Sequence, residues 1–333
     1  MNREIDKKRN SAFSMVVGSV EEGPVTSIQT IDDRLYTIKE RSIYVLKLAD
    51  DTDPRRTNAE IPHTHQKILS YGSASPFVGK TLLTAICLCD PTYVSSKINW
   101  QAVIRCSFEA LKNISSINDS TIKFSSDVRA ALKLTRENFT NGSMLMPSIE
   151  HVHQRCTDVI QKAEHSIQAL YQITQLFYPE SRGKFFEGFE NYIRQTYGSE
   201  DPFTEFLSED ALPFLLLIRH ARHCIEHPKR NEQITTFDFT LNASGQILPP
   251  AIKILHPKSA LDSMAISEFF NALMLRIPHV FENMLAFLCS KNLEPFGQMR
   301  FELVSLPKNA RREKHVRFSY QLVDSDGKPI GTV

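Results

Sequence analysis

Apolar residues recur at helical spacing through the middle of the chain, between residues 147 and 291. Positions three to four apart line one face of a helix, so this periodicity predicts a bundle of amphipathic helices. Alternating apolar and polar positions interrupt it once, which predicts a β-hairpin inserted before the last helix. The helices are expected at 147–175, 184–197, 203–227 with a break near Pro213, and 262–291 with Asp262 as cap and a kink at Pro278; the hairpin strands are expected at 234–241 and 246–255 around a turn at 242–245.

Both ends of the chain show a strand-like pattern instead. Near the N-terminus, short β-branched segments alternate with turn signals, and a polar stretch at 49–65 reads as an exposed loop. Two apolar segments follow at 80–88 and 100–111, the second with a helical pattern. At the C-terminus, Asp326-Gly327 between alternating segments is a hairpin signal. The expected N-terminal strands cover 14–20, 25–31, 34–40 and 42–48, and the C-terminal ones cover 299–306, 315–323 and 328–333.

These patterns predict an α+β protein with three parts. Residues 1–145 form a mixed α/β domain, residues 146–293 a helical domain, and residues 294–333 a C-terminal β-hairpin extension. At 333 residues and 41% hydrophobic content, the chain is long enough for two ordinary cores.

Charge and cysteine content exclude several classes of protein. The net charge is +1, so any binding of an anion must depend on a local cluster rather than on the field of the whole chain. The six cysteines are scattered, which favours reduced, buried thiols over a disulfide framework or a zinc ribbon. Without a signal-like N-terminus or a run of about 20 apolar residues, the expectation is a soluble, cytoplasmic protein that does not enter a membrane.

The segment at 212–227, LPFLLLIRHARHCIEH, carries the main chemical signal. Its apolar residues at 214, 215, 218, 221 and 225 place a charged cluster on the last turns of a helix, before Pro228. Two arginines and three histidines accompany one glutamate there. So many cations at a helix end need solvent, an anionic ligand or a second subunit to balance them.

Within this cluster, residues 222–227 have the form Arg-polar-x-x-x-His. This motif resembles the signature of HEPN domains, small helical bundles often found in prokaryotic toxins and defence proteins. The resemblance implies a metal-independent endoribonuclease or RNA-binding protein without a cofactor, with Arg222, His223 and His227 at its catalytic site. It also implies a homodimer and a role as a toxin or anti-phage effector. An antitoxin or regulatory partner is not identified, and the N-terminal domain would then sense or regulate.

The chemistry of these residues suits RNA cleavage, which needs a base, an acid and a cation for the charged phosphorane. On a regular helix, however, Arg222 and His227 would point about 140° apart (about 100° per residue). Pro228 should push His227 out of the helix and let its side chain swing back. A symmetric dimer would also bring two motifs together. His223 is expected to orient Arg222 or to contact phosphate.

Other interpretations of the same residues remain open. Arg222 with Glu226, and Arg219 with His223, are i,i+4 pairs, so an ordinary charged helix end on a non-catalytic interaction protein also explains them. His223-x-x-Glu226-His227 matches the pattern of a zinc peptidase with Glu302 as third ligand, although Pro228 and the absence of a glycine-containing continuation count against it.

Three further signals are weaker. Residues 74–81, ASPFVGKT, approach a phosphate-binding loop but lack its first glycine. His63, His65, His151 and His153 could assemble a metal site, although exposed histidines are the default. For the basic run Lys308, Arg311, Arg312 and Lys314, a solvated loop is favoured over an RNA-binding patch.

Overall fold

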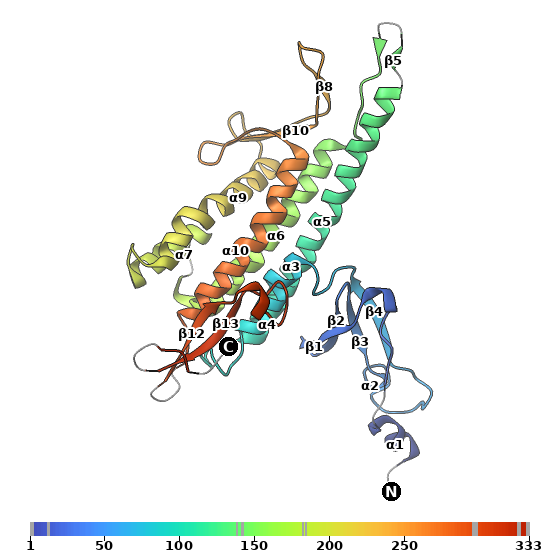
Figure 1. The fold of residues 1–333 in the computed structure, drawn as a ribbon, viewed down its shortest axis with the longest axis vertical. Coiled ribbons are helices and arrows are strands. Elements are labelled where there is room, and N and C mark those ends of the chain that lie inside the picture. The colour runs from blue at the N-terminus through green and yellow to red at the C-terminus, as the bar shows by residue number, and fades with distance from the viewer. Residues whose placement is uncertain are drawn as a thin grey trace. The chain divides into compact units, whose positions relative to one another are not determined.

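The computed structural model describes residues 3–11, 14–137, 139–140, 143–181, 183, 185–294, 299–324 and 328–330. The chain is an α+β protein that divides into two compact units (Figure 1). The first comprises Met1–Arg105 and Glu294–Val333, and the second comprises Cys106–Leu293. The boundary expected at residue 145 therefore lies at residue 105. The C-terminal segment, expected as a separate extension, belongs to the first unit.

A four-stranded antiparallel sheet with the order β1-β2-β3-β4 forms the N-terminal part of the first unit. Its turn between β1 and β2 uses Asp32 and Asp33, both with positive φ (48° and 59°), as a tight hairpin requires. Ile38 and Ile43 are fully buried in its core. The strands are β1 Val25–Ile31, β2 Arg34–Lys39, β3 Ile43–Lys47 and β4 Thr64–Leu69.

Two expectations for this region are wrong. Residues 14–20 do not form a strand. The Lys39 ammonium donates hydrogen bonds to the carbonyls of Val17 and Ser19, at 2.8 and 2.7 Å, so these carbonyls are not used in a β-ladder. The stretch 49–65 is not one loop, because it contains the short helix α2 (Ala49–Thr52) and the start of β4.

The C-terminal strands join the first unit through a helical segment at 76–88. That segment comprises α3 (Pro76–Val78), a π-helical stretch (Gly79–Leu83) and α4 (Thr84–Leu88). Strands β12 (Arg300–Ser305) and β13 (Phe318–Val323) pair antiparallel, and the Tyr320 hydroxyl donates to the Leu88 carbonyl at 2.5 Å. The expected turn at Asp326-Gly327 lies outside the described residues.

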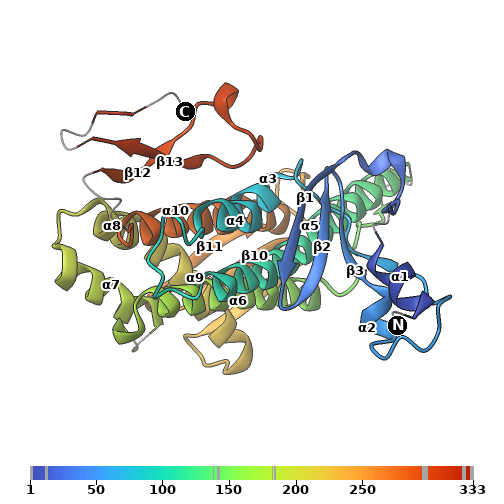
Figure 2. The ribbon, with the colours of Figure 1, turned by 90° about the horizontal axis from the view of Figure 1, so that it is seen from below.

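Helices build the second unit, as the periodicity predicts. α6 contacts both α9 and α10 (Figure 2), and α5 joins them through a Phe124–Phe270 ring contact of 5.4 Å. The break expected near Pro213 does not occur, because the backbone stays helical from α8 through a π-helical stretch, Phe206–Ala211, into α9. The long helices are α5 Trp100–Glu137, α6 Val152–Phe177, α7 Phe185–Tyr197, α9 Leu212–Glu226 and α10 Ile266–Ser290, with a short α8 at Pro202–Glu205.

The insertion before the last helix is also confirmed, although each expected strand is divided in two and a further strand, β11, follows. β7 (Gln233–Phe237) and β10 (Ala251–Leu255) pair antiparallel, and β8 (Thr240–Leu241) with β9 (Ile247–Leu248) forms the tip. Asp262 does not cap a helix. It lies in β11 (Leu261–Ala265), which pairs with β10, and this pairing delays the start of α10 to Ile266.

α10 differs from expectation in another respect. It is long and apolar enough to cross a membrane by length and mean hydropathy, and it continues through Pro278. Yet 61% of its most apolar window is buried inside the protein. In this structure its apolar residues form the core of the second unit, with Phe270, Phe281 and Leu285 fully buried.

Candidate functional site

The end of α9 arises as the sequence predicts. His227 leaves the helix, with φ −135° and ψ 61°, because the following Pro228 disfavours helical backbone at that position. Its N–H still closes the last turn on the His223 carbonyl at 2.8 Å. The His227 side chain is exposed, and because its backbone is not helical it does not follow the regular step of about 100° per residue of α9.

Arg222 is ion-paired within its own helix. Its Nη2 lies 2.5 Å from Oε1 of Glu226, one turn later, and its side chain is 21% exposed. This is the i,i+4 pair that the charged-helix interpretation expects. The guanidinium charge is thus balanced locally, and an anionic ligand would have to compete with Glu226 for it.

His223 lies between a carboxylate and a second imidazole. Its Nε2 is 3.5 Å from Oε2 of Glu232, and its ring centroid is 5.2 Å from that of His227. The turn after α9 brings Glu232 back to the helix end, where the Lys229 ammonium, 2.8 Å away, lowers the pKa of that carboxyl. The contacts found for His223 are therefore not with Arg222, which it was expected to orient.

Sequence reasoning missed a cavity of about 520 Å³ beside this helix end. α6 contributes the buried Glu164 to its lining, and α9 contributes Arg219, Arg222, His223 and Glu226. His227 is not among the described residues that line it. The signal that could have revealed it is Glu164 itself, a carboxylate on the apolar face of a helical pattern.

Glu164 is 7% exposed, and burial raises the pKa of its carboxyl. Oε1 accepts a hydrogen bond from Gln168 Nε2 at 3.1 Å, whereas the buried Oε2 has no partner among the described residues. The charges of Arg219 and Arg222 act on this carboxyl and lower its pKa, against the effect of burial. The cavity therefore combines a buried acceptor with two guanidiniums.

Histidines also gather on the other side of α9. The rings of His220 and His256 stack at 4.0 Å with 17° between their planes, and His220 Nδ1 lies 2.9 Å from the Ser259 hydroxyl. Burial lowers the pKa of both imidazoles. A smaller hollow of about 320 Å³ lies here, and Arg219 and His223 line it as well. The end of α9 thus lines two hollows, with Arg219 and His223 common to both.

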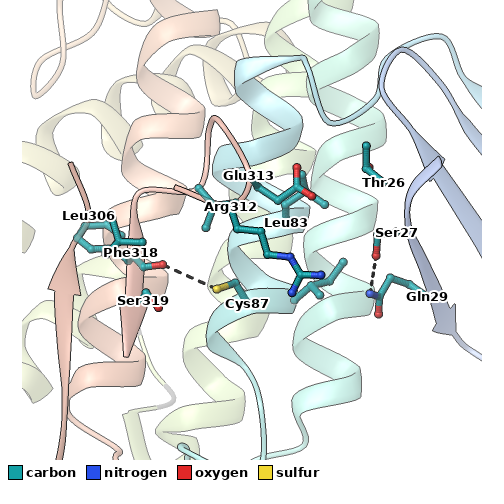
Figure 3. Close-up of a pocket in the computed structure, with 12 residues that line it drawn as sticks. Thr26, Ser27, Gln29, Leu83, Cys87, Leu306, Arg312, Glu313, Phe318 and Ser319 are labelled. Carbon is teal, nitrogen blue, oxygen red and sulfur yellow. Dashed lines mark hydrogen bonds between the residues drawn. The ribbon is translucent and has the colours of Figure 1, made fainter. Parts of the chain in front are cut away.

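The first unit has a cavity of its own, about 410 Å³ in volume (Figure 3). Its walls come from β1, α4 and the connection between β12 and β13. Cys87 donates to the Phe318 carbonyl at 3.8 Å, and Arg312 and Glu313 are its charged residues. Arg312 is exposed in the connection between β12 and β13, as expected of a solvated loop, and it also lines this cavity.

Two weaker sequence signals do not form the sites considered for them. Gly79, in the stretch that approaches a phosphate-binding loop, is helical with φ −58° and lies against His315, so no phosphate cradle forms there. Within the part of the chain that the structure describes, no three His, Cys, Asp or Glu side chains converge as a metal site requires. His63 and His65 accept backbone N–H groups, and Glu302 pairs with Arg300.

No family model, no curated protein and no solved structure matches this chain. The geometry around the end of α9 and the motif that it contains are therefore the basis for inferring a function.

Proposed function

We propose that this chain is a HEPN-like, metal-independent endoribonuclease whose site lies at the end of α9. The observation that carries the proposal is the pair of imidazoles, His223 and His227, with ring centroids 5.2 Å apart, of which His223 directly follows Arg222 in the helix. Two imidazoles, which can serve as base and acid, next to a permanent planar cation are the set that RNA cleavage requires.

The reaction assigned to this set is an internal transesterification. One neutral imidazole takes the proton of the 2′-hydroxyl, and the 2′-oxygen then attacks the adjacent phosphorus. The bond from phosphorus to the 5′-oxygen breaks, and the second imidazole, protonated, gives its proton to that oxygen. Arg222 exchanges Glu226 for the phosphorane oxygens and stabilises their charge. The products are a 2′,3′-cyclic phosphate and a 5′-hydroxyl.

The proposal includes a homodimer and a cellular role. Because His227 and Glu226 are exposed, a twofold axis near the end of α9 would bring two motifs together and complete one site from two chains. The role in keeping with the motif is that of a toxin or anti-phage effector. The first unit, with its own cavity, would sense or regulate.

The test is cleavage of a fluorescent single-stranded RNA by the full chain in the presence of a chelator. Replacing Arg222 or His227 by alanine should reduce the rate by about 10²–10⁴-fold, since charge stabilisation and proton transfer each contribute that much. Arg222→Lys should also be poor, because an ammonium cannot replace the planar fork. Arg230→Ala and His153→Ala are matched controls at exposed positions of the same unit.

Folding of each variant is checked by thermal unfolding, since losing the partly exposed Arg222–Glu226 pair should cost less than about 1 kcal/mol. Light scattering on a sizing column gives the oligomeric state. If the wild-type chain is a dimer and does not cut RNA, or if the variants cut as fast as the controls, the nuclease proposal fails. The Arg222–Glu226 ion pair would then mark a charged helix end on a non-catalytic interaction protein.

A further inference from the structure

We propose that the cavity between α6 and α9 binds a guanine base of the RNA, with Glu164 accepting its N1–H and N2–H groups and Arg219 donating to O6 and N7. The inference rests on the proposed function and gives it a sequence preference. It also makes a prediction about free nucleotides that does not depend on cleavage.

Glu164 has an acceptor atom that is not used within the protein. Oε2 of Glu164 is buried and has no hydrogen-bond partner among the described residues, which is costly unless a ligand supplies a donor. Oε1, bonded to Gln168, keeps a second lone pair. A carboxylate in this state can accept two parallel N–H groups. Among the four RNA bases, guanine alone presents two adjacent donors, N1–H and N2–H, on its pairing edge.

A guanidinium from α9, that of Arg219, lines the cavity together with Glu164 from α6. The Arg219 Cζ lies 4.1 Å from the centre of the Phe185 ring. That stacking holds the guanidinium plane in place, which suits a paired contact with the two acceptors of guanine. A planar base could also stack on the outer face of Arg219 or on the half-exposed Tyr171, which contacts Phe185 at 4.8 Å.

Size and position agree with this assignment. A volume of about 520 Å³ falls within the range of small-ligand pockets, about 300–1,000 Å³. Arg222 and His223 line the cavity as well, so a nucleotide whose base contacts Glu164 would place its phosphate near the proposed catalytic groups. Donors from the base would favour the ionised carboxylate and so offset the effect of burial on the Glu164 pKa.

The experiment measures binding of GMP, AMP, CMP and UMP to the full chain at neutral pH by titration calorimetry. GMP should bind about tenfold or more tightly than the others, because a paired contact to a base edge discriminates by about that much or more. Glu164→Gln replaces an acceptor by a donor and should remove most of this preference. Arg219→Gln, at an exposed position where folding is not at risk, should also weaken it.

Glu282→Gln is the matched control, since Glu282 is a buried carboxylate of α10 that does not appear among the described lining residues. It should bind GMP as the wild type does. Equal affinity for the four nucleotides, preference for AMP, no binding at all, or full preference in both variants would overturn the proposal.

Cleavage separates this inference from the function on which it rests. His227→Ala should keep the preference for GMP, because His227 is not among the described residues that line the cavity, and should cut RNA about 10²–10⁴-fold more slowly. If the wild-type chain cuts RNA without favouring guanine, the base pocket is wrong and the nuclease stands. If GMP binds selectively but RNA is not cut, the pocket stands and the nuclease is wrong.

Discussion

The ion pair between Arg222 and Glu226 makes a sharp prediction about RNA affinity. In the free protein, Glu226 forms an ion pair with the guanidinium of Arg222, with 2.5 Å between Nη2 and Oε1. The proposed mechanism requires this guanidinium to bind phosphate instead. Glu226→Gln removes this competitor and leaves the side chain's shape almost unchanged. The variant should therefore bind single-stranded RNA more tightly than the wild type.

Salt dependence gives the prediction a magnitude. Each additional contact between a cation and a single-strand phosphate steepens the fall of log K with log salt by about 0.7. Between about 50 and 200 mM salt, the ratio of variant to wild-type affinity should then fall by about 2.6-fold. The cost to folding should be small, about 0.3–0.5 kcal/mol for an i,i+4 pair with a 45% exposed glutamate.

Fluorescence anisotropy with a labelled 2′-O-methyl RNA, which cannot be cut, measures both quantities. Glu205→Gln is the matched control, since it makes the same charge change at an exposed position of α8. An affinity ratio that stays at one across the salt series, or weaker binding by Glu226→Gln, would refute the idea that Arg222 contacts phosphate.

Two further predictions concern stability. Gly79→Ala should destabilise the first unit by about 1–3 kcal/mol in thermal or urea unfolding, because its Cβ would lie 2.3 Å from His315 Cβ. Gly188→Ala in α7, whose Cβ would have Gly183 C at 3.4 Å as its nearest neighbour outside the helix among the described residues, should be neutral or stabilising. Burial lowers the pKa of His220 and His256 below the ordinary 6.5, so the unfolded chain binds more protons just below that pH and stability should be lost as the pH falls through 6.5. His220→Phe, which keeps a ring stacked on His256, should flatten unfolding midpoints measured from pH 7 to pH 5, and an unchanged slope would contradict this explanation.

Most helices of the second unit could be predicted because their signal is local. The helix that could not be predicted in full is α5 (Trp100–Glu137), of which apolar spacing predicts only residues 100–111. Apolar spacing predicts α6, α7 and α10 to within a few residues, except where tertiary pairing competes, and the helix expected at 203–227 covers α8, the π-helical stretch and α9. Asp262 shows the exception, since its segment pairs with β10 and lies in a strand although an aspartate before an apolar run is a good helix cap. Residues 14–20 show the same effect, because a single buried lysine takes two of their carbonyls.

In the candidate site too, the features that depend on local sequence could be predicted and those that depend on tertiary packing could not. The exit of His227 from the helix follows from Pro228 alone, and the Arg222–Glu226 pair follows from i,i+4 spacing. Glu164 could not be placed, because it is 58 residues before Arg222 and meets it only through the packing of α6 on α9. No local pattern reports a contact of that kind.

The charge balance at the end of α9 links these observations. A cluster of cations at a helix end requires compensation, and the structure supplies it from three carboxylates: Glu226 on the same helix, Glu232 on the returning turn and Glu164 on α6. With these groups ionised, the site carries no large net positive charge to hold RNA of any sequence. Affinity must then come from exchange, in which phosphate replaces Glu226 and a base satisfies Glu164. Such a site favours a ligand that fills both roles, because a ligand that only replaces Glu226 leaves the buried Glu164 Oε2 without a partner among the described residues.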